Sequence, residues 1–169
     1  MKKLFVDLIV RNPSAMLLII GVFLFHSSFT QEDELSAKAH AKLGEELFDR
    51  GEYAEAADHL YSAWSFKKKK EEWLYGAGLS YEYIQDYKNA AKAFEQLKES
   101  KKYKDSRLKY AHMLKQTGQY QMASKEFLDY IYEYDEDDKN VVERKVQNEI
   151  RGCELGIQLI ETGNISGLE

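Results

Sequence analysis

Cysteine is almost absent from this chain of 169 residues, which contains Cys153 alone. A single cysteine excludes an intramolecular disulfide, so stability must come from the packing of helices. Cys153 falls on the apolar side of its segment, with Ile150 and Ile157 at helical spacing. We therefore predict that Cys153 is buried, because an unpaired cysteine behaves as a small hydrophobic residue.

Sequence motifs of catalysis and metal binding are also lacking. The histidines beyond residue 30 are His40, His59 and His112, and they do not have the spacing of metal ligands. No serine, histidine and aspartate grouping carries a nucleophile motif, and residues 76–78 are too short for a phosphate-binding loop. We predict no enzyme activity, no catalytic residue, no metal and no cofactor.

Positive charge is in deficit. The chain has a net charge of −5, and the part beyond residue 30 has 21 Lys and Arg against 28 Asp and Glu. This balance argues against a general nucleic-acid binder, which usually presents a basic face. The lysine runs at 67–70 and 101–104 fall near expected helix ends, where they favour the helix dipole. The alternative is a patch for phosphate or lipid headgroups.

No apolar run reaches the ~20 residues that a membrane-spanning helix needs. Basic residues precede an uncharged apolar run at 15–25, and small residues follow it. This pattern predicts a secretory signal peptide over residues 1–30, cleaved near Thr30/Gln31. The alternative is an anchor that stays in the membrane. The segment has no cysteine, which excludes lipid attachment at that cleavage point.

An internal repeat is the strongest positive feature. Tyr53, Tyr87 and Tyr120 recur at intervals of 34 and 33 residues. Each is followed by an alanine after three residues and a large apolar residue after seven, namely Ala56 and Leu60, Ala90 and Phe94, Ala123 and Phe127. Small residues lie nine before each tyrosine, and the turn residue two before is Gly51, Gln85 or Gly118. This pattern predicts antiparallel helix pairs that must stack to bury their apolar stripes.

These residues resemble the tetratricopeptide (TPR) repeat. Within residues 31–137 we expect three repeats, at 37–70, 71–103 and 104–137. The proline that often closes a TPR unit is missing, since the only proline is Pro13. Residues 138–162 are expected to form a long helix over the apolar edge of the last repeat. The predicted fold class is all-α, a TPR-like α-solenoid of three helix pairs plus this C-terminal capping helix. Residues 163–169 are a tail where a further domain could start.

The TPR resemblance implies a concave surface lined by the first helix of each pair. Its predicted partner-binding residues are Phe48, Tyr75, Leu79, Tyr83, Leu108 and His112. An aromatic and aliphatic strip with polar edges suits an extended peptide or a partner's helix. The alternative is that several of these side chains pack against neighbouring helices.

Certain TPR domains hold the C-terminal carboxylate of chaperones with Lys and Asn. The positions that match that site are Ala41, Glu45, Gly76 and Asp105. Two acids and no lysine exclude that ligand.

A narrower resemblance comes from the whole arrangement. The signal peptide, three tyrosine-rich units, an acidic link and the stretch at 149–156 are similar to the N-terminal part of certain bacterial envelope proteins. In that family the TPR region precedes a β-propeller and an OmpA-like peptidoglycan-binding domain, and some members belong to the type IX secretion and gliding apparatus. The resemblance implies an exported scaffold at the periplasmic side of the outer membrane, with a protein or peptide partner and only indirect membrane contact. Peptidoglycan would be bound only through a downstream domain. The alternatives are an accessory of a cell-wall enzyme and a chaperone-like holder of secreted clients.

Overall fold

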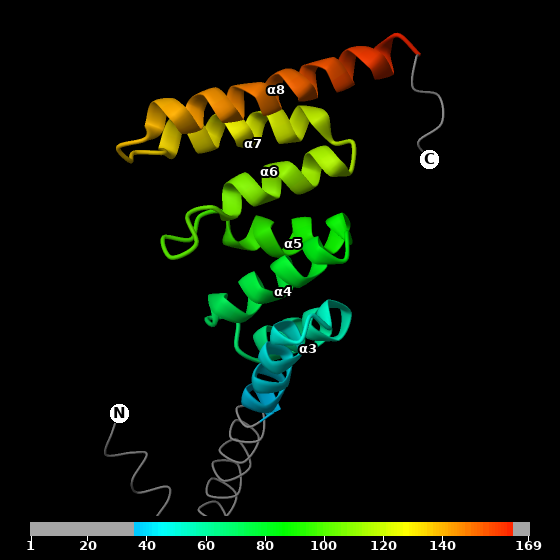
Figure 1. The fold of residues 1–169 in the computed structure, drawn as a ribbon, viewed down its shortest axis with the longest axis vertical. Helices are drawn as coiled ribbons and strands as arrows, with labels where there is room; N and C mark the ends of the chain where they lie inside the picture. Colours follow the sequence, from blue (N-terminus) through cyan, green and yellow to red (C-terminus); the bar gives the residue numbers. More distant parts are fainter. Residues whose placement is uncertain (1–35, 164–169) are drawn as a thin grey trace, which may run out of the picture.

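The computed structural model describes residues 36–163, and all regular structure within this range is helical. Residues 36–49 are helical and lead into a series of further helices (Figure 1). These are α3 (Tyr53–Phe66), α4 (Glu71–Tyr83), α5 (Tyr87–Leu97), α6 (Ser106–Gln116), α7 (Tyr120–Glu133) and α8 (Lys139–Glu161). The predicted signal peptide at 1–30 lies outside the described residues.

The helices are stacked in the order of the sequence (Figure 1). From α3 to α8, the substantial contacts all join helices that follow one another along the chain. A stack held together by contacts between neighbours is an α-solenoid. Helix 36–49 pairs with α3, α4 with α5 and α6 with α7, and the long helix α8 closes the end. The predicted fold class is therefore confirmed.

The turn inside each helix pair uses one backbone conformation. The residue two before each repeated tyrosine has a positive φ, which is 79° at Gly51, 60° at Gln85 and 75° at Gly118. This left-handed region favours glycine, because a Cβ atom is crowded there. Gln85 is the one non-glycine residue in 36–163 with a positive φ. The second turn is thus strained where the other two are relaxed.

We expect Gln85→Gly to raise the free energy of unfolding by about 1 kcal/mol, because it relieves this strain. Urea denaturation followed by far-ultraviolet circular dichroism measures the change. Gln96→Gly is the matched control, because Gln96 is exposed within α5 and glycine there should destabilise the protein by about 1 kcal/mol. Equal losses for both variants would contradict the strain at residue 85.

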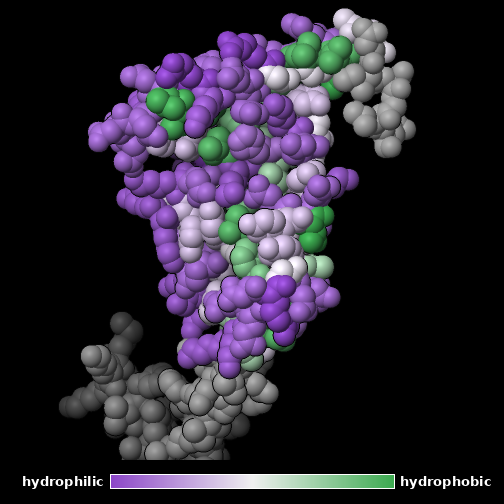
Figure 2. Space-filling view, viewed as in Figure 1, coloured by the Kyte–Doolittle hydropathy of each residue, from purple (hydrophilic) through white to green (hydrophobic). Residues whose placement is uncertain are grey.

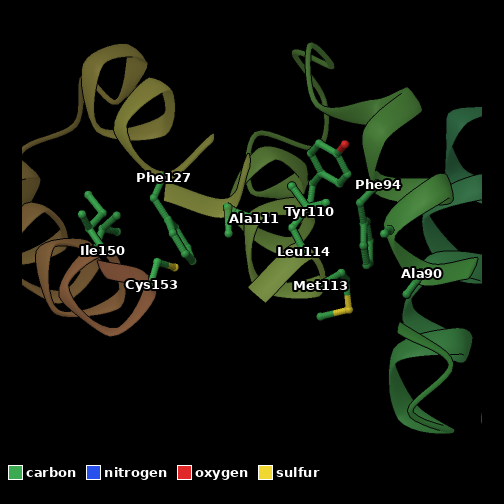
Figure 3. Close-up of a cluster of buried hydrophobic side chains, with 12 residues drawn as sticks. Ala90, Phe94, Tyr110, Ala111, Met113, Leu114, Phe127, Ile150 and Cys153 are labelled. Carbon is green, nitrogen blue, oxygen red and sulfur yellow. The ribbon is translucent and has the colours of Figure 1, made fainter. Parts of the chain in front are cut away.

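The core depends on small residues facing large ones. A Cβ atom on Gly44 would lie 2.7 Å from Cγ of Leu60, and one on Gly78 would lie 2.8 Å from Cε1 of Phe94. Each glycine therefore leaves the space that the large side chain of the same repeat fills. Figure 3 shows how this packing continues from Phe94 through the third repeat into α8. The small residues nine before Tyr53 and Tyr87 therefore let the two helices of a pair approach closely.

Helix α8 covers the last repeat through tight apolar contacts. Cys153 is fully buried in one cluster with Phe127 and Ile150 (Figure 3), which confirms the predicted burial. This burial raises the pKa of the Cys153 thiol. A Cβ atom on Gly156 would lie 2.7 Å from Cε2 of Tyr120, so the helix backbone approaches that ring closely. The outward side of the N-terminal half of α8 includes Arg144, Gln147 and Arg151, whereas Leu155 and Ile160 are exposed nearer its C-terminal end.

In each helix pair, one residue of the first helix faces one residue of the second, and the two residue types differ from repeat to repeat. The residue on the first helix comes four before the small residue that precedes each repeated tyrosine by nine. The residue on the second helix comes three after the repeated alanine. Its members are His40 with His59, Leu74 with Ala93, and Arg107 with Glu126. The two histidine Nδ1 atoms are 2.8 Å apart, whereas Leu74 and Ala93 are both buried in the apolar core. We call these residues the register pairs.

The third register pair is a buried ion pair. The Arg107 side chain is 6% exposed and that of Glu126 is 8% exposed, with 2.8 Å between Nη1 and Oε2. Glu126 also accepts a hydrogen bond of 2.6 Å from Lys98 Nζ. The Arg107 guanidinium donates further hydrogen bonds to Glu99 and to Glu133. A cavity of about 370 Å³ beside this network is lined mainly by charged side chains.

Candidate functional site

The first helix of each pair lies on one side of the stack, together with α8. We call this side, made of residues 36–49, α4, α6 and α8, the first-helix face. Side-chain contacts join consecutive members of it, such as Phe48 to Tyr83 and Lys115 to Glu149. All the predicted partner-binding residues are on these helices. Their role in binding stays a prediction, but the structure separates them into two groups.

Tyr75 belongs to the group that holds helices together. Its hydroxyl donates a hydrogen bond of 2.7 Å to Asp105, at the start of α6. Its ring is stacked on Tyr103 with 4.2 Å between ring centroids, and it also packs edge-on against Phe94. Burial and the Asp105 carboxylate raise the pKa of the Tyr75 phenol. Tyr75 therefore fixes the second repeat against the third.

His112 and the two leucines have similar packing roles. The His112 ring meets Phe127 edge-on at 5.0 Å, and its Nδ1 lies 3.9 Å from Oε2 of Glu149. Burial lowers the pKa of His112, which favours the neutral imidazole at neutral pH. Leu79 and Leu108 are partly buried against the core. These three side chains leave only part of their surface to a ligand.

Phe48 and Tyr83 form the second group and have a third partner, Tyr53. The Tyr53 and Tyr83 rings are nearly parallel, at 16°, with 4.3 Å between centroids. Phe48 packs edge-on against both, at 5.3 Å from Tyr53 and 5.9 Å from Tyr83. Tyr83 remains 60% exposed. We call these three residues the aromatic cluster. Sequence reasoning missed Tyr53, which it used only to define the repeat.

Charged residues on most of the first-helix face are paired with one another. Glu82 of α4 lies 3.1 Å from Lys109 of α6, and Lys115 of α6 lies 2.8 Å from Glu149 of α8. These ion pairs connect each first helix to the next. They also neutralise the central and C-terminal parts of the face.

The N-terminal end of the face is different. Glu45 and Asp49 are exposed, and neither has an ion-pair partner within residues 36–163. With Phe48 they occupy positions i, i+3 and i+4 of one helix, so all three share a side. An unpaired negative charge therefore lies beside the aromatic cluster. This is the part of the first-helix face with the most capacity for a ligand.

Between residues 36 and 163 no three histidine, cysteine or acidic side chains gather closely enough to hold a metal ion. None of the helices in that range is long and apolar enough to cross a membrane. Figure 2 shows that the viewed side of the molecule is mostly hydrophilic, with small separate hydrophobic areas.

The fold is an α-solenoid of the TPR type. Its helix pairs are stacked, small residues face large ones, and each pair has a turn residue in the left-handed conformation.

No model of a known protein family matches the chain, and no curated protein matches it. Solved TPR domains share its fold. The Sgt2 TPR domain from Aspergillus fumigatus is 15% identical with a TM-score of 0.52, and the match covers 79% of this chain and 86% of that one.

Two further structures contain bound peptides. The first TPR of Spaghetti (RPAP3), bound to the HSP90 peptide SRMEEVD, is 13% identical with a TM-score of 0.54. The match covers 70% of this chain and 95% of that one. The second TPR domain of human RPAP3, in complex with the HSP70 peptide SGPTIEEVD, is 17% identical with a TM-score of 0.53. It matches 70% of this chain and 98% of that one. At these identities the likeness establishes the fold.

Proposed function

We propose that this chain is an exported scaffold that binds protein or peptide segments on its first-helix face. The observation that carries the proposal is the aromatic cluster at the N-terminal end of that face, in which Tyr83 is exposed. Aromatic side chains contribute much of the binding energy at protein interfaces. The two RPAP3 domains with bound peptides are examples of this fold in a peptide-binding role.

The ligand should differ from the acidic peptides of those two neighbours. Glu45 and Asp49 would repel an acidic segment at the N-terminal end of the face. Asp105 is a further acid at a position that matches the carboxylate site, and its side chain is engaged by Tyr75. These residues support the expectation that a chaperone C-terminus is not the ligand.

We place this activity in a bacterial envelope complex, at the periplasmic side of the outer membrane. The signal-peptide pattern at 1–30 supports export, and the resemblance of the stretch at 149–156 supports an envelope role. A secretion or gliding apparatus linked to the outer membrane and peptidoglycan is the setting that the resemblance favours. The chain would act there as an adaptor between proteins.

Site-specific photo-crosslinking in cells of the source organism tests this proposal. A benzoylphenylalanine at position 83 should crosslink a small, fixed set of envelope proteins and should be found in the periplasmic fraction. The matched control is position 132, because Tyr132 is 88% exposed on α7, away from the first-helix face. Position 83 is preferable to position 75, since Tyr75 holds two repeats together.

Three results would contradict the proposal. Equal crosslinking from positions 83 and 132 would show that the first-helix face is not a specific binding surface. Crosslinks to many unrelated unfolded proteins would indicate a chaperone-like holder. A cytoplasmic location would overturn the envelope assignment, whatever the crosslinked partner.

A further inference from the structure

We propose that the aromatic cluster, with Glu45 and Asp49, binds a positively charged segment of the partner. An arginine or lysine side chain would lie against the Tyr53 and Tyr83 rings while the two carboxylates pair with its charge. This inference rests on the proposed function and specifies the chemistry of the ligand.

The geometry of the rings suits a cation. The faces of aromatic rings carry partial negative charge, which attracts ammonium and guanidinium groups within about 6 Å. Phe48 makes a T-shaped contact with each of the two tyrosines, so it holds the stacked pair in place. Tyr83 is 60% exposed, although one face of its ring is stacked on Tyr53. The cluster is therefore an ordered aromatic platform with an accessible side.

The chain itself uses the same chemistry elsewhere. Within residues 36–163, lysine Nζ atoms lie between 5.0 and 5.8 Å from aromatic ring centroids at several sites. These pairs are Lys68 with Trp64, Lys70 with Trp73, Lys98 with Tyr110, Lys102 with Tyr103, and Lys109 with Phe94. In the same range no cation of the chain lies over a ring of the aromatic cluster. Its rings are therefore not occupied by any cation of residues 36–163.

The charges around the cluster favour the same ligand. Nearby cations are engaged by other carboxylates, since Arg50 lies 2.9 Å from Glu52 and Lys42 lies 3.8 Å from Glu46. Glu45 and Asp49 form no ion pair with either of these cations. A cationic ligand would gain both carboxylates and the ring faces, whereas an acidic one would be repelled.

Isothermal titration calorimetry of the purified protein tests the inference. The probe is a capped peptide in which arginines alternate with serine and glycine, and the matched probe has citrulline, which is neutral, in place of each arginine. We expect the citrulline peptide to bind about tenfold more weakly. Tyr83→Ala should weaken the arginine peptide about tenfold, whereas Tyr83→Phe keeps the ring and should stay within about twofold.

The carboxylates are tested separately. The double variant Glu45→Gln and Asp49→Asn should weaken the arginine peptide about threefold and reduce the salt dependence of its binding. Both side chains are exposed, so the fold should be preserved, which circular dichroism can verify. Tyr132→Ala and Glu154→Gln are controls on exposed residues of α7 and α8, and neither should change the affinity.

Equal binding of the arginine and citrulline peptides would overturn the inference, and so would equal affinities of Tyr83→Ala and Tyr132→Ala. The proposed function can be judged independently. Specific crosslinks from position 83 together with equal binding of the two peptides would retain the scaffold and reject the cationic ligand. Absence of specific crosslinks together with selective arginine binding would reject the cellular role and retain the site.

Discussion

Replacement of Arg107 by methionine is expected to lower the free energy of unfolding by about 3 to 5 kcal/mol. Arg107 is buried on α6, where it pairs with Glu126 and also reaches Glu99 and Glu133. Without the guanidinium, Glu126 would be a buried carboxylate that retains only its contact with Lys98. Removal of one partner of a buried ion pair is more destabilising than removal of both, because the remaining charge is still desolvated.

The double variant Arg107→Met and Glu126→Met should therefore recover most of the lost stability. Urea denaturation of both variants and of the unaltered protein, followed by circular dichroism, measures the difference. Arg144→Met is the control, since Arg144 is exposed on α8 and should change stability by no more than about 0.5 kcal/mol. If Arg107→Met were as stable as the unaltered protein, the buried network would be without energetic importance.

Phe94→Ala should also cost about 3 to 5 kcal/mol, for a different reason. Phe94 is fully buried in the second repeat, and its ring fills the space beside Gly78. Collapse of the neighbours into the cavity is limited on the α4 side, because Gly78 has no side chain and Tyr75 is held by Asp105. Since Phe94 lies in the middle of the stack, its loss should also weaken the coupling between the two ends.

Phe94→Leu provides the matched control. Leucine occupies the equivalent position in the first repeat, where Leu60 packs beside Gly44. We expect this smaller change to cost about 1 kcal/mol and to keep a single unfolding transition. Phe66→Ala, on a 46% exposed side chain, should have little effect. Similar losses for Phe94→Ala and Phe66→Ala, measured by urea denaturation, would contradict the packing described for the core.

The repeat frame could be predicted from the sequence because its causes are local. Ala56, Ala90 and Ala123 are all fully buried, as close contact between the helices of each pair requires. The turn residues follow the same rule, and Gln85 adopts the backbone conformation of its glycine counterparts. Because the pattern occurs three times, these steric requirements can be recognised from the sequence alone.

The register pairs were not predicted, although the sequence contains a signal for them. Charged residues on amphipathic helices are normally solvated, so their residue types do not indicate that Arg107 and Glu126 are buried. Their burial depends on which helices cover them, and spacing along one helix does not give that information. The signal is that both positions change together between repeats, from two histidines to leucine with alanine and then to arginine with glutamate.

For the candidate site, the sequence indicates which helices carry the residues, but it does not indicate which of those residues stay exposed. Helical spacing indicates which residues share the first-helix face, but it does not show how far the next helix covers them. Tyr75 and His112 turned out to contact neighbouring helices, whereas Tyr83 remains accessible. Tyr53 is part of the cluster because residue 83, on which it stacks, is a tyrosine. The equivalent residue of the next repeat is Gln116, which has no ring.

The register pairs have a consequence for how the chain finds its order while folding. Repeats of similar sequence can close on the wrong partner, because their apolar stripes are nearly interchangeable. If the helix of Arg107 closed on α3, it would place a guanidinium against His59 and leave Glu126 without its cation. Such a closure would bury unmatched charge, so each first helix selects its own second helix. The varied pairs thus discriminate against exchanged helices, within one chain and between two copies of it.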